Sequence, residues 1–85
     1  MKFQKIPPKM SNQAARKIKS MGANDKARIK SGILGIPKGN IKPLAGTDDS
    51  FRLRVGSWRI IFSWISAEQI LVEKIDRRGQ VYKGV

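Results

Sequence analysis

Arginine alternates with apolar residues in one short stretch, residues 51–62, which reads FRLRVGSWRIIF. Such alternation is typical of a strand with one buried face. Gly56 and Ser57 lie between the two halves, with glycine at the first central position of the turn, as a type II′ turn requires. An arginine guanidinium is planar, stays charged and binds phosphate through paired hydrogen bonds. The stretch therefore predicts a β-hairpin that presents guanidinium groups to a phosphate.

The turn determines which residues of this hairpin share a face. With the turn at the Gly-Ser pair, Val55 faces Trp58 and Arg54 faces Arg59, and cross-strand partners point to the same side. One apolar face is then expected to contain Phe51, Leu53, Val55, Trp58, Ile60 and Phe62. Arg52 joins the two other arginines on the opposite face. Because like charges facing each other destabilise a sheet, we interpret the three arginines as a preorganised phosphate clamp. The alternative is a solvated face with its side chains fanned outward.

A third strand is expected over residues 70–76, after a turn at 66–69. If Ile65 pairs with the first residue of this strand, Lys74 and Asp76 join the arginine face. The same register points Glu73 toward the apolar side, a conflict that a bulge or a basic neighbour would resolve.

Two residues near the C-terminus are further candidates for the site. Arg78 can reach the end of the arginine face. Tyr82, the only tyrosine, lies in a polar segment. It is either a hydrophobic anchor for this segment or a phenol placed over the phosphate clamp.

The charge balance favours a polyanionic partner. The chain has 18 Lys and Arg against 6 Asp and Glu, a net charge of +12 and a pI near 10.9. Self-repulsion of this size destabilises a compact state, whereas neutralising nucleic-acid phosphates releases counterions and favours binding. The alternative is a basic surface that serves only solubility.

Composition also excludes several kinds of site. The chain has no cysteine and no histidine, which excludes disulfides, thiol catalysis and the commonest metal ligand. The six carboxylates show no metal-ligand spacing, so we predict no metal and no cofactor. No apolar run approaches the ~20 residues of a membrane span, and we expect a cytoplasmic protein without a membrane partner.

The remaining elements indicate an α+β fold in one domain, residues 1–85. We expect an N-terminal strand over residues 1–6 and a helix over 11–21 with Ser11 as its N-cap. A second helix is expected from its cap Asn24 to Gly35, followed by a connection at 38–50. The two helices form a hairpin, and the three-stranded antiparallel meander of the second half packs on them.

The stretch from Phe51 to Tyr82 resembles the RelE branch of the RelE/ParE toxin superfamily. Residues 51–62 resemble the family pattern YRLRVGDYRVIY, and residues 74–82, KIDRRGQVY, resemble its ending KIGHRGDVY. Residues 42–46, KPLAG, resemble the KKLKG segment before the sheet. The resemblance implies a single RelE-like toxin domain of a type II toxin–antitoxin system.

Members of the RelE branch enter the ribosomal A site and cleave mRNA, where the 2′-hydroxyl attacks the neighbouring phosphate and leaves a cyclic phosphate. The resemblance, with the arginine pattern, predicts the catalytic residues Arg54, Arg59, Arg78 and Tyr82. The predicted RNA-binding residues are Lys42, Arg52, Lys74 and Arg77.

The resemblance also implies a role for each catalytic side chain. Arg54 and Arg59 would stabilise the negative charge of the transition state, and Arg52 would orient the RNA backbone. Arg78 would stabilise or protonate the departing 5′ oxygen. Tyr82 would take the 2′-hydroxyl proton if neighbouring cations lowered the pKa of its phenol.

This chain departs from the family pattern at three points. RelE has lysines where this chain has Arg52 and Arg54, and many relatives carry a histidine where this chain has Arg77. The spacing from Arg78 to Tyr82 is also shorter. The absence of histidine predicts weak chemistry away from the ribosome.

Two other functions are compatible with the same residues. A ParE-like toxin would share the fold and inhibit DNA gyrase without needing convergent cations. A non-catalytic nucleic-acid-binding module would bind in a salt-dependent way without cutting. For either toxin we expect an acidic antitoxin, partly disordered alone, that folds along this surface, and a monomer outside that complex.

Overall fold

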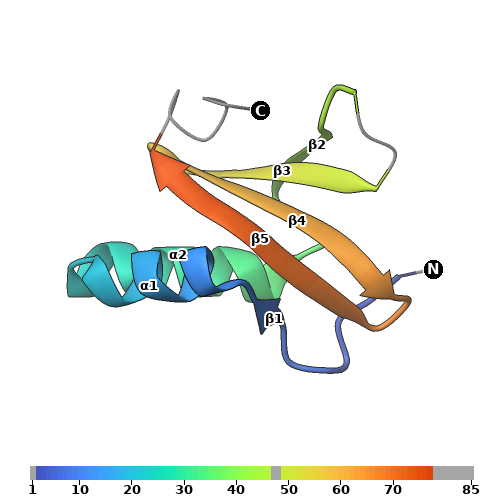
Figure 1. Ribbon diagram of the computed structural model, residues 1–85, viewed down its shortest axis with the longest axis horizontal. Helices are drawn as coiled ribbons and strands as arrows, with labels where there is room; N and C mark the ends of the chain where they lie inside the picture. The colour runs from blue at the N-terminus through green and yellow to red at the C-terminus, as the bar shows by residue number, and fades with distance from the viewer. Residues whose placement is uncertain (1, 47–48, 78–85) are drawn as a thin grey trace.

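A computed structural model describes residues 2–46 and 49–77 and shows an α+β fold, as the sequence predicts. Both helices lie on the same side of a five-stranded sheet, whose strand order is β1-β5-β4-β3-β2 (Figure 1). The elements are β1 (Lys9–Met10), α1 (Asn12–Ser20), α2 (Ala23–Gly35), β2 (Asn40–Pro43), β3 (Ser50–Val55), β4 (Trp58–Ser66) and β5 (Gln69–Arg77). Neither helix in the described ranges is long and apolar enough to cross a membrane.

The β3–β4 hairpin has the predicted register. Val55 pairs with Trp58, and Arg54 pairs with Arg59. Gly56 has φ +58, and no non-glycine residue of the described chain has a positive φ. The turn therefore has the one left-handed position that a type II′ turn places at its first central residue.

The hydrophobic core lies between the helices and one face of the sheet, which we call the inner face. The hairpin, β5 and the two helices contribute its most deeply buried side chains: Leu53, Ile60, Phe62, Ile70, Val72, Ile75, Ala14, Ile29 and Ile33. Gly32 lets α2 pack closely on the sheet, because a Cβ at this position would lie 2.8 Å from the Val55 Cγ2 atom.

The predicted N-terminal strand is wrong in position. Residues 2–8 have no strand structure, and the strand begins at Lys9, which pairs in parallel with Leu71 of β5. The preceding segment instead lies along the β4–β5 turn, where the Phe3 N–H donates to the Ala67 carbonyl at 2.9 Å. Pro7 and Pro8 have no N–H for a β-ladder, so the chain joins the sheet only after them.

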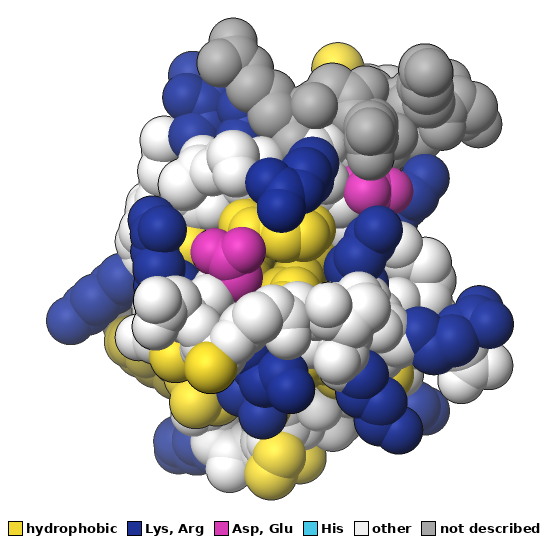
Figure 2. All heavy atoms as spheres, turned by 90° about the vertical axis from the view of Figure 1, so that its left-hand side faces the viewer, with side chains coloured by type: hydrophobic (Ala, Val, Ile, Leu, Met, Phe, Trp, Pro, Cys, Tyr) yellow, Lys and Arg dark blue, Asp and Glu magenta, His cyan; other side chains and the backbone are white. Residues whose placement is uncertain are grey.

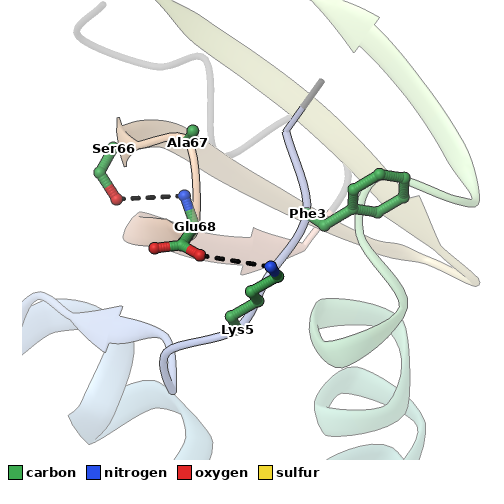
Figure 3. A pocket seen from close by; sticks show the side chains of 5 residues that line it. All are labelled: Phe3, Lys5, Ser66, Ala67 and Glu68. Carbon is green, nitrogen blue, oxygen red and sulfur yellow. Dashed lines mark hydrogen bonds and ion pairs between the residues drawn. The ribbon is translucent and has the colours of Figure 1, made fainter.

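The contact between the N-terminal segment and the β4–β5 turn includes side chains (Figure 3). The Lys5 ammonium lies 3.6 Å from the Glu68 carboxylate, and both side chains are largely exposed. The Ser66 hydroxyl accepts a hydrogen bond from the Glu68 N–H at 3.1 Å. The Ser66 bond orders the turn itself. The Lys5–Glu68 ion pair and the backbone bonds from the segment to the turn hold the segment at the end of the sheet away from the β3–β4 turn.

The connection predicted over residues 38–50 contains a strand that the sequence did not indicate. β2 pairs with β3 in antiparallel order, with Ile41 opposite Leu53 and Lys42 opposite Arg52. Among the described residues, only β3 bonds to β2, so one edge of β2 needs no N–H donor and Pro43 is tolerated at its end. The sheet therefore has an edge strand beyond the predicted meander.

The first helix begins as predicted, and the connection between the helices differs. Ser11 is the N-cap of α1, and its hydroxyl accepts a hydrogen bond from the Ala14 N–H at 3.1 Å. α1 ends at a Met21 cap, and Gly22 is the N-cap of α2 in place of Asn24. Only the two extended cap residues, Met21 and Gly22, separate the helices. The connection between the helices is therefore shorter than predicted.

Replacing Ser11 with alanine should lower the free energy of unfolding by about 1–2 kcal/mol. The Ser11 hydroxyl caps α1 and also donates to the Glu73 carbonyl of β5 at 2.7 Å, so the change removes two hydrogen bonds. Urea denaturation measures the difference. Ser20→Ala is the matched control, because within the described part of the chain that exposed hydroxyl bonds only the local Lys17 carbonyl. Equal losses in both variants would contradict the assignment.

Candidate nucleic-acid interface

The pairing of β4 with β5 leaves the predicted register only in its middle part. It begins with Ser66 opposite Gln69, as that register requires, and a first irregularity follows between Ser66 and Trp64. Trp64, rather than Ile65, pairs with Ile70. A register shift then follows between Phe62 and Ile61, which leaves Glu73 as an extra residue in β5. Such a β-bulge places two residues of one strand opposite one of its partner.

The bulge restores the predicted pairing in the second half of β5. Ile61 pairs with Lys74, and Arg59 pairs with Asp76. Lys74 and Asp76 therefore lie on the arginine face, as predicted. This face is the side of the sheet opposite the helices, and we call it the outer face.

Two cross-strand rows of the outer face contain most of the predicted site. The first row is Lys42, Arg52, Ile61 and Lys74, from β2 to β5. The second row is Asn40, Arg54, Arg59 and Asp76. Because side chains directly across a strand pair lie about 5 Å apart at Cβ, four strands contribute to one continuous surface.

The three arginines of the outer face differ in exposure. Arg54 is exposed and Arg52 is half-buried, whereas Arg59 is only 4% exposed. The Arg59 Nη1 donates to the Trp58 carbonyl at 3.3 Å, which contributes to holding this guanidinium in place. The three therefore do not form a uniformly solvated fan: Arg54 is directly accessible, and Arg59 forms part of the floor of the face.

Arg52 has a buried donor without a protein partner. Its Nε atom is inaccessible to solvent and makes no hydrogen bond within the described ranges. Most buried donors in native proteins have a partner. Arg52 is thus partly packed into the surface, and only the exposed part of its side chain is open to an anion.

Among the predicted RNA-binding residues, Lys42 and Lys74 lie with Arg52, whereas Arg77 does not. The Arg77 guanidinium carbon lies 4.6 Å from the centre of the Trp58 ring, and Trp58 belongs to the inner face. Strand parity causes this separation, because Arg77 follows Asp76 directly and points to the other side. The arrangement is a cation–π contact rather than part of the arginine face.

Arg78 and Tyr82 lie outside the described residues. The structure therefore says nothing of the two predicted catalytic side chains nearest the C-terminus, and their roles stay predictions.

Two carboxylates also belong to the outer face. Asp76 is held from α1, because the Lys17 ammonium lies 3.4 Å from its Oδ1. Glu73 reaches across β4, and its Oε2 accepts a hydrogen bond from the Ser50 hydroxyl of β3 at 3.1 Å. Sequence reasoning did not place Glu73 in the site. The clue in the sequence was that the predicted register pointed Glu73, a charged residue, toward the apolar inner face. The bulge removes this conflict.

Basic side chains dominate the side of the molecule on which β5 ends. Figure 2 shows Lys and Arg side chains around a small apolar patch, with fewer Asp and Glu side chains among them. Such a distribution attracts an extended anion. Among the described residues, no group of three or more His, Cys, Asp or Glu side chains could hold a metal ion.

The edge of β5 beside the site is closed by a side chain of α1. The Gln13 amide donates to the Ile75 carbonyl at 2.9 Å and accepts from the Ile75 N–H at 3.0 Å. Gln13 thus replaces a neighbouring strand where the two-residue β1 has ended. Together with Lys17, it holds the part of β5 that carries Asp76.

Comparisons with solved structures identify the fold. A chain of the RelB–RelE antitoxin–toxin complex of Methanococcus jannaschii superposes with a TM-score of 0.70, at 22% identity over 87% of this chain and 94% of that chain. The archaeal RelE–RelB complex of Pyrococcus horikoshii OT3 gives 0.66, at 23% identity over 94% and 99%. The intact E. coli RelBE toxin–antitoxin complex gives 0.68, at 13% identity over 86% and 96%.

The structural matches show that this chain has the RelE-type toxin fold. No family model matches the sequence, and no curated protein matches it significantly. At these identities the likeness concerns the arrangement of the helices and strands, and the function must be argued from the residues of the site.

Proposed function

We propose that this protein is the toxin of a type II toxin–antitoxin system and that it cleaves mRNA on the ribosome, in the cytoplasm. The observation that carries the proposal is the convergence of Arg52, Arg54 and Arg59 on the outer face of a RelE-type sheet. Lys42 and Lys74 extend the same face. Folding does not require this cluster, because like charges in adjacent positions destabilise a sheet.

The proposed reaction suits fixed cations. When the RNA 2′-hydroxyl attacks the adjacent phosphorus, negative charge grows on the non-bridging oxygens of the phosphate. Preorganised donors stabilise that charge without reorganising during the reaction. Arg54 is exposed and can contact these oxygens directly, with Arg59 opposite it as a held guanidinium. Arg52, half-buried in the adjacent row, would bind a neighbouring phosphate.

A partner protein is part of the proposal. The structures that share this fold are complexes of RelE with RelB. A chain of net charge +12 is well suited to an acidic antitoxin that covers the basic outer face. We expect co-expression of the antitoxin to relieve growth arrest caused by this protein, as measured by colony counts. Continued arrest with every acidic neighbouring open reading frame would count against the partner.

Binding to RNA should weaken steeply with salt, and outer-face residues should set the slope. For single-stranded RNA, each neutralised phosphate contributes about −0.7 to the slope of log K against log salt. Lys42→Ala should therefore make the slope shallower by about 0.7, measured by fluorescence anisotropy with a labelled oligonucleotide. Lys19→Ala is the matched control, because Lys19 is an exposed lysine of α1, in the helical layer across the sheet. Equal changes in both variants would place binding elsewhere.

The enzymatic part of the proposal is tested with purified protein and ribosomes programmed with a defined mRNA. We expect cleavage in the A-site codon, with a cyclic phosphate at the new 3′ end. Supercoiling by DNA gyrase is measured with the same protein preparation. Inhibition of gyrase with intact mRNA would replace the ribonuclease by a gyrase inhibitor. RNA binding without either activity would leave a binding module.

A further inference from the structure

Glu73 is a carboxylate that the β-bulge brings onto the basic outer face. The bulge is held from α1, since the Ser11 hydroxyl donates to the Glu73 carbonyl at 2.7 Å. β-bulges occur frequently beside active sites, where they redirect a side chain. The predicted register without a bulge would point Glu73 to the inner face, whereas with the bulge Glu73 lies on the face that carries the arginines.

The Glu73 carboxylate lies across the middle of the sheet. It starts from β5 and meets Ser50 on β3, so it passes over β4 near Ser63, the β4 partner of Ser50. Arg52 is the next outer-face residue along β3. The carboxylate is half-buried, and its Oε2 accepts a hydrogen bond from the Ser50 hydroxyl. Its Oε1 makes no hydrogen bond or ion pair with another described residue.

RNA binding does not explain a negative charge at this position. A carboxylate repels phosphates and weakens binding on a surface that neutralises them. The hydrogen bond with Ser50 does not explain it either, because a glutamine amide oxygen would accept the same bond. A carboxylate differs from glutamine in one relevant respect, which is that it can take up a proton.

We propose that Glu73 is the general base of the cleavage reaction, an inference that rests on the proposed function. Oε1 takes the 2′-hydroxyl proton while the 2′ oxygen forms a bond to phosphorus. The bond from phosphorus to the 5′ oxygen breaks, and that oxygen leaves with the electron pair and takes a proton from solvent. Glu73 then returns its proton to solvent. The products are a 2′,3′-cyclic phosphate and a 5′-hydroxyl, without any metal or cofactor.

The charged groups that face Glu73 are lysine and arginine side chains, with the Asp76 carboxylate further along β5 in the row of Arg59. Arg52 faces it from β3, Lys74 from β5 and Lys42 from the end of the same row on β2. Lys9 of β1 lies on the same side, through its pairing with the outer-face residue Leu71. Lysine and arginine side chains ordinarily stay protonated between pH 6 and 8.5, so a rate change in this range reports the proton acceptor.

The test is the pH dependence of single-turnover cleavage of ribosome-bound mRNA by the full chain. With a carboxylate base, the wild-type rate should be nearly constant from pH 6 to 8.5, because carboxylates are ionised there. Glu73→Gln should lower the rate at pH 7 by about 10²–10⁴-fold, the usual contribution of a general base. Its remaining rate should rise about tenfold per pH unit, because hydroxide then supplies the base.

Two further variants separate catalysis from structure. Glu73→Asp keeps a carboxylate and should keep the flat pH profile at a reduced rate. Glu68→Gln is the matched control, since it removes one carboxylate charge at the β4–β5 turn, where Glu68 pairs with Lys5. It should leave the rate unchanged. RNA affinity of Glu73→Gln should equal or exceed that of the wild type, because a repulsive charge is removed.

The possible failures are distinguishable. Wild-type protein that leaves ribosome-bound mRNA intact would overturn the proposed function. If the wild type cleaves and Glu73→Gln cleaves at the same rate, only the role of Glu73 is overturned. A slower Glu73→Gln with a flat profile would reduce Glu73 to a positioning residue. A wild-type rate that itself rises tenfold per pH unit would show that the base is a group with a higher pKa than a carboxylate, such as the Tyr82 phenol. Tyr82→Phe would then lose that rate.

Discussion

Arg54→Ala should lower the rate of mRNA cleavage on the ribosome by about 10²–10³-fold, which is the usual effect of removing one preorganised donor from a transition state. Arg54 is the exposed arginine of the outer face and lies opposite Arg59. Its guanidinium can therefore reach the phosphate directly. The measurement is single-turnover cleavage at saturating protein, which separates the chemical step from binding.

Arg16→Ala is the matched control for this prediction. Arg16 is an exposed arginine of α1, and its removal changes the net charge equally. Its rate should stay within about twofold of the wild type. If both variants lost activity equally, general electrostatic attraction would account for the arginines, and the clamp on the outer face would be wrong. An unchanged rate in Arg54→Ala would exclude this side chain from the reaction.

Phe62→Ala should lower the free energy of unfolding by about 3–5 kcal/mol, the range observed for aromatic residues truncated in a core. Phe62 is 1% exposed and lies at the centre of the inner face. Its ring also stacks on Phe51, with 5.6 Å between centroids. Small domains are stable by only about 5–15 kcal/mol in total, so this change removes a large share of the stability.

Urea denaturation followed by circular dichroism measures the loss. Phe3→Ala is the matched control, because Phe3 is 47% exposed in the N-terminal segment. It should lower the stability by less than about 1 kcal/mol, since little surface changes its environment. Comparable losses in the two variants would show that the inner face of the hairpin is not the centre of the core.

The hairpin could be predicted because local chemistry determines it. A glycine-led two-residue turn leaves one register for residues 51–62, and a strict alternation then assigns every side chain to a face. Both the apolar inner face and the position of Arg52, Arg54 and Arg59 follow from that register. The Ser11 cap was predictable for the same reason, because a hydroxyl before an amphipathic run bonds its own helix.

The short edge strands could not be predicted, because their neighbours create them. β1 has two residues and β2 has four, and neither has an apolar alternation of its own. Each forms where a paired strand offers free backbone groups at the right distance. Local sequence placed the first strand before Pro7, whereas the observed strand follows Pro8.

The bulge explains what was right and wrong in the third strand. A simple ladder cannot satisfy both the pairing of Trp64 with Ile70 and the pairing of Ile61 with Lys74. One extra residue, Glu73, resolves the difference and gains a place on the outer face. Arg77 shows the opposite case, because alternation alone would have placed it beside Trp58 on the inner face. The resemblance to the family pattern suggested that Arg77 binds RNA, but the alternation of side chains along β5 decides the face to which Arg77 points.

The most direct test of the central claim is to map mRNA 5′ ends in cells that express this protein, beside cells that express Arg54→Ala. We predict new ends at a constant position within codons, present with the wild type and lost in the variant. The same ends should persist with Arg16→Ala. Growth arrest without new 5′ ends would contradict the ribonuclease, and equal cleavage by Arg54→Ala would contradict the arginine face as its active site.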